Sequence, residues 1–186
     1  TLHPVPPSGG KIMLSKKLEA ALNKQINEEY YSSYIYLAMA AYLEDANLDG
    51  CAHWMRMQAQ EEYQHAMKIF DYMIDRGARV ELFQVEAPPK EWKSAKDVFE
   101  ASLAHEKYMT DNINTLADLC IAEKDHATNN LMQWYVSEQV EEEAQVDDIL
   151  KKLEMMGSDG PGLFLMDREL KSRPAPSILS GDGAAE

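Results

Sequence analysis

The chain has 186 residues and a mass of 21.1 kDa, which is enough for one domain with a sizeable core. Acidic residues outnumber basic residues by 32 to 18, giving a net charge of -14 at pH 7. Because nucleic acid and anionic membranes repel such a charge, we expect neither as a partner. The longest apolar stretches are far shorter than the roughly 20 residues that cross a bilayer, so we expect no membrane-spanning segment.

The cysteine content and the start of the chain indicate a compartment. Cys51 and Cys120 are too few for a disulfide framework or a zinc cluster, and we expect them to pack as small hydrophobic groups. No charged segment followed by an apolar core opens the sequence, so we expect no secretory signal. The resulting interpretation is a cytoplasmic protein with reduced thiols.

The two ends of the chain differ in composition from its middle. Residues 1–12 are rich in proline and glycine and lack apolar periodicity, which predicts an extended N-terminal tail. Residues 172–186 are rich in proline, glycine, alanine and serine and predict a flexible C-terminal tail. Residues 13–171 are predicted to form a single helical-bundle domain between them.

Four long segments of this domain show helical periodicity. We expect helices over residues 15–45, 49–76, 94–123 and 125–157, and a short fifth helix over residues 162–170. Ser15 and Ser94 are the predicted N-caps of the first and third helices, and Gly77 is the predicted C′ residue of the second. Residues 80–85 are the best strand candidate, but they are too few to be convincing.

The connections between these helices define the topology. About four residues join the first two helices and few join the last two long ones, so each pair is expected to form an antiparallel hairpin. Residues 78–93 separate the second and third helices. Roughly 16 extended residues reach about 53 Å, whereas each helix rises about 40–45 Å. The sequence therefore predicts an all-α four-helix bundle with one long crossover between helices two and three.

Carboxylates interrupt the apolar stripes that should face the core. Every long helix carries at least one on its apolar face. They are Glu29, Glu62, Glu106, Glu138 and Glu142. Glu29, Glu62, Glu106 and Glu142 lie about 20–26 Å from the relevant helix ends, at about 1.5 Å per residue, so they should meet near the middle of the bundle.

A buried cluster of acids needs compensating cations. Unpaired charges in a core cost several kcal/mol each, and no lysine or arginine lies on these stripes. Two divalent metal ions would neutralise four carboxylates. Glu62 and His65 have the spacing that presents an oxygen and an imidazole to one ion, although the same spacing also suits a surface pair. Glu123 and His126 repeat it at a polar helix end, where we expect no metal.

Several strings resemble the ferritin family, specifically the non-haem ferritins of bacteria and archaea. The resemblance covers roughly residues 13–170. The strings are NEEYYSSYIY at residues 27–36, AQEEYQH at 59–65, His105-Glu106, and QWYVSEQVEEE at 133–143. The resemblance implies a ferritin-like bundle with a short fifth helix, a homo-oligomeric cage of twenty-four subunits, and iron storage.

The resemblance also implies a di-iron ferroxidase centre. Glu29, Glu62 and His65 match the ligands of a first iron. Glu62 would bridge to a second iron held by Glu106 and Glu142. Iron is then the expected metal, as Fe(II) and Fe(III), with dioxygen or peroxide as the oxidant and mineral as the stored form.

Further residues are assigned by this resemblance alone. Gln139 matches a glutamine beside the second pair of ligands, although its position by itself assigns no role. Tyr36 matches a tyrosine close to the first iron, although taken singly it is an ordinary core aromatic. Glu61, Glu138 and Glu141 match a third iron site, and for Glu61 and Glu141 the alternative is solvated helix charge.

The sequence departs from related families at informative positions. Gln145 stands three residues after Glu142, where a second Glu-x-x-His motif would have histidine, and this disfavours a bacterioferritin. Tyr63 occupies the place of the haem-ligating methionine of bacterioferritins, so we expect no haem. Asn129 and Met132 stand where animal ferritins place channel carboxylates, which leaves the iron access route open.

Iron storage with ferroxidase activity is the leading hypothesis, and two others come from different classes. One is a cage that sequesters iron without fast oxidation, which the intact ligand set argues against. The other is a di-iron oxidase or peroxidase of the rubrerythrin type. The absence of a Cys-x-x-Cys module and of a second inward Glu-x-x-His motif disfavours it.

Overall fold

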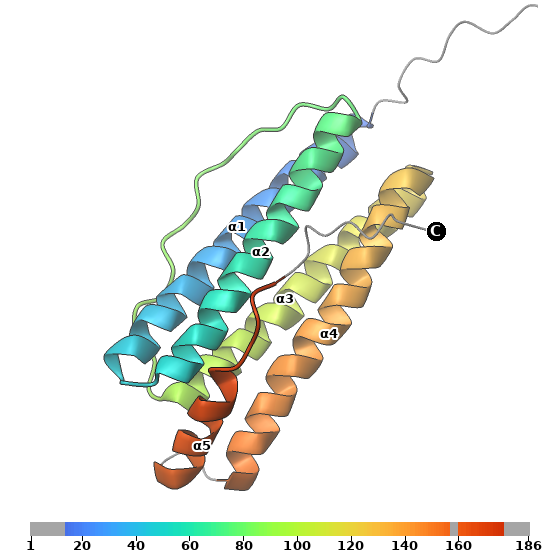
Figure 1. Cartoon of the computed structure of the whole chain (residues 1–186). Coiled ribbons are helices and arrows are strands. Elements are labelled where there is room, and N and C mark those ends of the chain that lie inside the picture. Colours follow the sequence, from blue (N-terminus) through green and yellow to red (C-terminus); the bar gives the residue numbers. More distant parts are fainter. Residues whose placement is uncertain (1–13, 157–159, 177–186) are drawn as a thin grey trace, which may run out of the picture.

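The protein is a bundle of long helices. The computed structural model describes residues 14–156 and 160–176, and within them it contains five helices and no strand. The helices are α1 (Lys16–Asp45), α2 (Asp49–Asp75), α3 (Ala95–Ala122), α4 (His126–Met156) and α5 (Gly160–Leu170). None of these helices has the combined length and apolarity needed to cross a bilayer. Four lie alongside one another and α5 packs against α2 and α4 at one end, which confirms the predicted fold class (Figure 1).

The helix ends follow the predicted capping chemistry. The side chains of Ser15 and Ser94 each accept a hydrogen bond from a backbone N–H three residues later, at 3.2 and 3.1 Å. Gly77 follows α2 with a φ of 70°, the left-handed conformation that favours glycine at C′. The largest difference from prediction is in α5, which begins at Gly160 and not at residue 162. Residues 1–12 and 177–186 of the predicted tails lie outside the described residues.

The crossover between α2 and α3 runs the length of α1. Near the start of α1, Asn23 donates to the carbonyl oxygen of Arg79 at 3.0 Å and accepts from the backbone N–H of Glu81 at 2.8 Å. Near the end of α1, the ring of Tyr42 packs edge-on against Trp92, with centroids 5.5 Å apart. The chain therefore starts α3 beside the start of α2, as the linker length predicted (Figure 1). The strand candidate at residues 80–85 is part of this crossover.

The core consists of two apolar clusters with a polar layer between them. One cluster includes Leu22, Ile26, Ile69, Ile113 and Tyr135. The other includes Tyr36, Met55, Phe99, Val146 and Leu153. Along each long helix, the residues between the two clusters include buried polar side chains, among them Glu29, Glu62, His65, Glu106, Gln139 and Glu142. A polar layer in this position is costly unless its members neutralise one another or bind a cation.

Candidate metal centre

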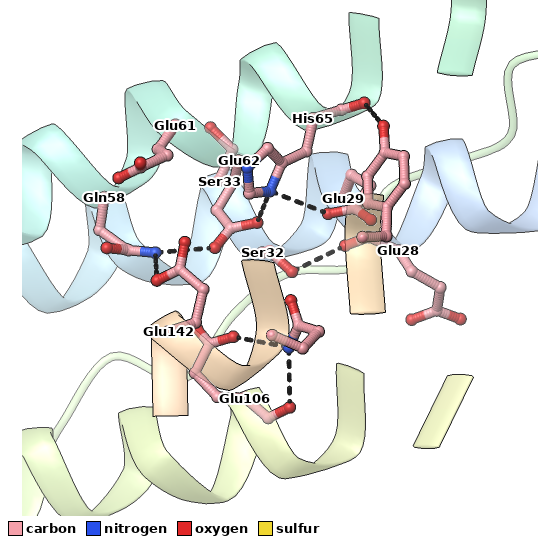
Figure 2. Close-up of polar contacts among 12 residues, drawn as sticks. Glu28, Glu29, Ser32, Ser33, Gln58, Glu61, Glu62, His65, Glu106 and Glu142 are labelled. Atoms are coloured by element: carbon pink, nitrogen blue, oxygen red, sulfur yellow. Dashed lines mark hydrogen bonds and ion pairs between the residues drawn. The ribbon is translucent and has the colours of Figure 1, made fainter. Parts of the chain in front are cut away.

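The predicted ligands meet in this polar layer. Glu29 comes from α1, Glu62 and His65 from α2, Glu106 from α3, and Glu142 from α4. Each is between 1% and 3% exposed. Their polar atoms face one another across the bundle (Figure 2). The structure thus brings together, from four helices, the residues that the apolar stripes placed at mid-bundle.

These side chains form two groups that could each hold a metal ion. The first group is Glu29, Glu62 and His65, and the second is Glu62, Glu106 and Glu142. Within each group, one candidate ligand atom from every residue lies within 4.8 Å of the others. Glu62 belongs to both groups. Two ions bound here would lie on either side of one shared carboxylate, which is the arrangement of a dinuclear site.

The imidazole of His65 is directed at the carboxylates. Its Nδ1 lies 3.3 Å from Glu62 Oε2 and 3.9 Å from Glu29 Oε2. The ring packs edge-on against Trp134 and Tyr135, with centroids 5.4 and 5.9 Å away. The Tyr135 hydroxyl also donates to the His65 carbonyl oxygen at 2.7 Å. Nδ1 is therefore the nitrogen directed at the carboxylates of the first group.

Two glutamines that the sequence analysis missed hold the carboxylates in place. Gln25 Nε2 donates to Glu29 Oε1 at 2.9 Å. Gln58 Nε2 donates to Glu62 Oε1 at 3.0 Å and to Glu142 Oε2 at 2.6 Å (Figure 2). Both glutamines are buried, and each precedes a ligand glutamate by one helical turn. An amide four residues before a glutamate on the same apolar stripe is the signal that could have found them.

Tyr36 and Gln139 both contact Glu106. The Tyr36 hydroxyl donates to Glu106 Oε1 and lies 2.9 Å from Ser102 Oγ. Gln139 Nε2 donates to the backbone oxygen of Glu106 at 3.1 Å and lies 3.3 Å from its Oε2. Both residues therefore lie beside the second ligand group. That Tyr36 lies close to a first iron, as the resemblance implies, stays a prediction.

Burial and mutual repulsion shift the protonation of the cluster. Burial, together with the charge of Glu62, raises the pKa of Glu29 and of Glu106 to about 8. Burial and the charge of Glu106 raise the pKa of Glu142 well above its usual range. Burial also favours neutral Glu62, but the hydrogen bond and charge of His65 lower its pKa. Without metal, the cluster limits its charge by holding protons.

His65 is the cationic member of the cluster. Burial favours its neutral form, but the hydrogen bond to Glu62 and the charges of Glu62 and Glu29 raise the pKa of His65 to about 10. A metal ion would displace this proton, because a ligating imidazole is neutral. Four carboxylates and one imidazole are a donor set that suits two divalent iron ions in charge and in ligand type.

The three residues expected at a third site are arranged differently. Glu61 is partly buried, and its Oε2 lies 2.6 Å from Nη2 of Arg173, in the chain that follows α5. Glu138 is half-buried and Glu141 is exposed. Burial raises the pKa of Glu138, and the charges of Glu141 and Glu61 add to this effect. The three acids are close enough to interact, but the metal-ligand groups found among the described residues do not include them.

Other residues singled out from the sequence lie away from this cluster. Glu123, from the second Glu-x-x-His motif, pairs with Lys17 Nζ at 3.3 Å near the end of α3. Cys51 and Cys120 are free and fully buried, which confirms that they pack as small hydrophobic groups. Tyr63, at the place of a haem-ligating methionine, is 49% exposed.

The fold is a four-helix bundle, and its two carboxylate-rich ligand groups, which share one buried glutamate, could hold two metal ions. Comparison with known families agrees, because the ferritin-like domain matches residues 19–156. The chain therefore belongs to the ferritin family, and the resemblance found in its sequence is confirmed.

Individual relatives match over most of the chain. A probable bacterial non-heme ferritin-like protein of Haemophilus influenzae is 43% identical over 158 residues, 85% of this chain and 96% of that protein. A bacterial non-heme ferritin of Campylobacter jejuni is 41% identical over 160 residues, 86% of this chain and 96% of that protein. An open pore ferritin from Archaeoglobus fulgidus has a TM-score of 0.85 and 49% identity, covering 87% of this chain and 98% of that chain.

Proposed function

We propose that this protein stores iron and oxidises Fe(II) to Fe(III) at the buried centre. The observation that carries the proposal is the shared carboxylate of Glu62, which belongs to two ligand groups at the middle of the bundle. Membership of the ferritin family and the similarity to bacterial non-heme ferritins support iron as the ion. The high content of carboxylate oxygen suits iron better than a softer metal.

The ligand groups assign a place to each Fe(II) substrate ion. Glu29 and His65 would hold one ion, Glu106 and Glu142 the other, with Glu62 between them. Fe(III) is a harder cation than Fe(II), so anionic oxygen ligands stabilise it more and lower the reduction potential of the bound iron. Two Fe(II) ions supply two electrons, enough to reduce dioxygen to hydrogen peroxide or hydrogen peroxide to water.

The protonation of the ligands and the contacts of neighbouring residues determine how the cluster binds metal. Glu29 and Glu106 hold protons near neutral pH, and these must leave as metal binds. Tyr36 and Gln139 hold the Glu106 side chain from two sides. Trp134 packs edge-on against His65, and the residues of the first group are buried from solvent. The protein thus contributes fixed ligand geometry and a shielded site.

We also propose that the chain assembles into a cage of twenty-four copies in the cytoplasm, where its buried thiols stay reduced. A single bundle has no space for mineral. Its exposed large apolar side chains support burial between copies. They include Tyr34, Leu37, Tyr63, Leu82, Phe83, Phe164 and Leu165. Size exclusion with light scattering should give roughly half a megadalton, and a monomer or dimer would contradict the cage.

A third iron position at Glu61, Glu138 and Glu141 is also part of this proposal. The charges of Glu141 and Glu61, which help to raise the pKa of Glu138, support it. Anaerobic Fe(II) titration tests it by stoichiometry. Three ions per chain would agree with a third position, and two would restrict binding to the central pair.

Aerobic oxidation of Fe(II) tests the enzymatic part. We expect the Glu62→Ala/His65→Ala variant to oxidise added Fe(II) no faster than buffer. The matched control is Glu123→Ala/His126→Ala, which removes the other Glu-x-x-His pair and should keep the wild-type rate. Equal rates for wild type and Glu62→Ala/His65→Ala would refute ferroxidase activity at this centre.

A further inference from the structure

The chain after α5 runs back along α2, starting from the place where Asp167 of α5 contacts the first turn of α2. Asp167 Oδ1 accepts hydrogen bonds from the backbone N–H groups of Gly50 and Cys51 at 2.8 and 2.9 Å, in the first turn of α2. A Cβ at Gly50 would lie 1.7 Å from the Asp167 carbonyl oxygen, so this close approach requires glycine. From this point the chain turns back beside α2 (Figure 1).

This returning segment places Arg173 on one face of α2. The guanidinium carbon lies 4.3 Å from the ring centroid of Trp54, and Nη1 donates to the Trp54 carbonyl oxygen at 3.2 Å. Nη2 donates to Gln58 Oε1 at 2.7 Å and to Glu61 Oε2 at 2.6 Å. Trp54, Gln58 and Glu61 follow one another at helical spacing. The Arg173 side chain is only 14% exposed, so its position is specified by packing as well as by charge.

Gln58 connects this guanidinium to the metal centre. Its Oε1 accepts from Arg173, and its Nε2 donates to Glu62 and Glu142. An arginine only donates hydrogen bonds, so its contact forces the amide oxygen outward and the amide NH₂ toward the two carboxylates. With the amide reversed, an oxygen would face two carboxylates inside the core, and the NH₂ would face the guanidinium.

We propose that Arg173 is a positioning residue of the metal centre, acting through Gln58 on the ligand carboxylates of Glu62 and Glu142. This inference rests on the proposed function, since it concerns the same centre. The charge of Arg173 is balanced by Glu61. The guanidinium therefore orients the amide of Gln58 without placing an uncompensated charge beside the ligands. The C-terminal segment is thereby coupled to iron binding from outside the bundle.

Removal of the guanidinium should weaken binding at the second ligand group. Without Arg173, the NH₂ of Gln58 still faces the two carboxylates, but its oxygen loses the one donor found for it among the described residues, so the amide is held less firmly. Partners of metal ligands typically change affinity by about 10- to 100-fold when they are removed. Because Arg173 acts through one intermediate residue, we expect Arg173→Ala to weaken the second ion by about tenfold. Arg173→Lys keeps the charge but lacks the planar guanidinium group. Its affinity for the second ion should lie between those of wild type and Arg173→Ala.

The test is an anaerobic calorimetric titration of the full-length assembled protein with Fe(II), repeated with Zn(II). Arg168→Ala is the matched control, because it removes the same charge from an exposed position on α5. Its affinities should stay within about twofold of wild type. Gln58→Leu should weaken the second ion at least as much as Arg173→Ala, and the double variant should lose no more than Gln58→Leu alone.

The outcomes separate this inference from the proposed function. The role of Arg173 would be overturned if Arg173→Ala bound the second ion within twofold of wild type. It would also be overturned if the losses of affinity in Arg173→Ala and Gln58→Leu multiplied in the double variant. In both cases two ions would still bind. If Glu62→Ala/His65→Ala bound Fe(II) as tightly as wild type, the metal centre itself would be refuted. A tenfold loss in Arg173→Ala that disappears in the Gln58→Leu background would establish the coupling.

Discussion

Glu61 and Glu62 are neighbours in α2, yet the protein neutralises them in opposite ways. Glu61 faces the returning C-terminal segment and has a permanent cation, the guanidinium of Arg173, at 2.6 Å. Glu62 faces the bundle centre, where its partners are the imidazole of His65 and the amide of Gln58. A guanidinium stays charged at every physiological pH, whereas an imidazole can give up its proton. Glu62 is therefore the glutamate whose cationic partner, the protonated His65, can give way to a metal ion.

The far end of the bundle shows the same contrast. There Arg76 donates to Asp125 at 2.7 Å, and these hydrogen bonds lower the pKa of Asp125 to about 2. At the centre, burial raises the pKa of Glu29 to about 8. The chain thus supplies arginine where an acid has a structural role. At the centre it leaves the acids to protons or to metal ions.

The largest predicted difference is between alanine variants of these two neighbours. Glu62→Ala removes the carboxylate shared by both ligand groups, so it should abolish binding of both central ions and lower Fe(II) oxidation by more than about 100-fold. Glu61→Ala should keep two bound ions per chain and an oxidation rate within about threefold of wild type. Anaerobic titration and stopped-flow oxidation measure both. Equal losses in the two variants would remove the distinction between the inner and outer acids.

The second prediction concerns the pH dependence of the metal-free protein. Glu29 and Glu106 have a folded pKa of about 8, above the usual 4.5, so the folded state binds protons that the unfolded state has released between these values. The free energy of unfolding should therefore fall as pH rises through this window, by about 1.4 kcal/mol per pH unit and group. Stability from these groups is complete below pH 4.5 and lost above about pH 8.

Urea denaturation of the metal-free protein between pH 5 and 8 measures this slope. The Glu29→Gln/Glu106→Gln variant should show a shallower decline, because its amides do not titrate. Zn(II) added to the wild type at pH 8 should restore stability, since a bound cation takes the place of the protons. Parallel pH profiles for the two proteins would show that these carboxyls are not protonated in the folded state.

The third prediction isolates one ligand group. Among the ligand carboxylates of the described residues, Gln25 hydrogen-bonds Glu29 and not the others, so Gln25→Leu should weaken the first ion by about tenfold and leave the second within about twofold. Gln60→Leu, at an exposed position on α2, is the control. Calorimetric titration with Zn(II) resolves the two ions. A Gln25→Leu variant that weakens both ions equally would contradict the assignment of this glutamine to the first group.

The smallest predicted effect is at the outer acids. Removing Arg173 frees Glu61, so a third ion at Glu61, Glu138 and Glu141 should bind about threefold more tightly in Arg173→Ala than in wild type, since the site is partly exposed. This change is opposite in direction to the weakening expected at the second central ion. A third ion that binds more weakly in Arg173→Ala would show that the guanidinium does not compete with metal at Glu61.

Much of the fold and the centre could be predicted from periodicity. The apolar stripes located four helices, and the linker length placed the crossover. Glu29, Glu62, Glu106 and Glu142 were found because a carboxylate among apolar residues violates the pattern that surrounds it. Their common height then followed from helical rise alone. Such anomalies can be found in a sequence because the buried stripe of an amphipathic helix is otherwise consistently apolar.

The contacts that hold the centre in place were not predictable in the same way. Gln25 and Gln58 carry no charge, so their burial did not stand out among the polar residues of amphipathic helices. Arg173 lies in a segment whose composition predicted a tail, and only the docking of α5 through Asp167 brings it to α2. The contact of Tyr36 with Glu106 depends on how α1 and α3 pack, which sequence spacing does not specify.

The most direct test of the central claim is anomalous diffraction at the iron edge from crystals loaded with Fe(II) under anaerobic conditions. We expect two iron peaks inside each bundle, one on each side of Glu62, with Glu29 and His65 on the first and Glu106 and Glu142 on the second. Iron bound only at exposed acids, with the central carboxylates left to hydrogen bonds and protons, would contradict this expectation.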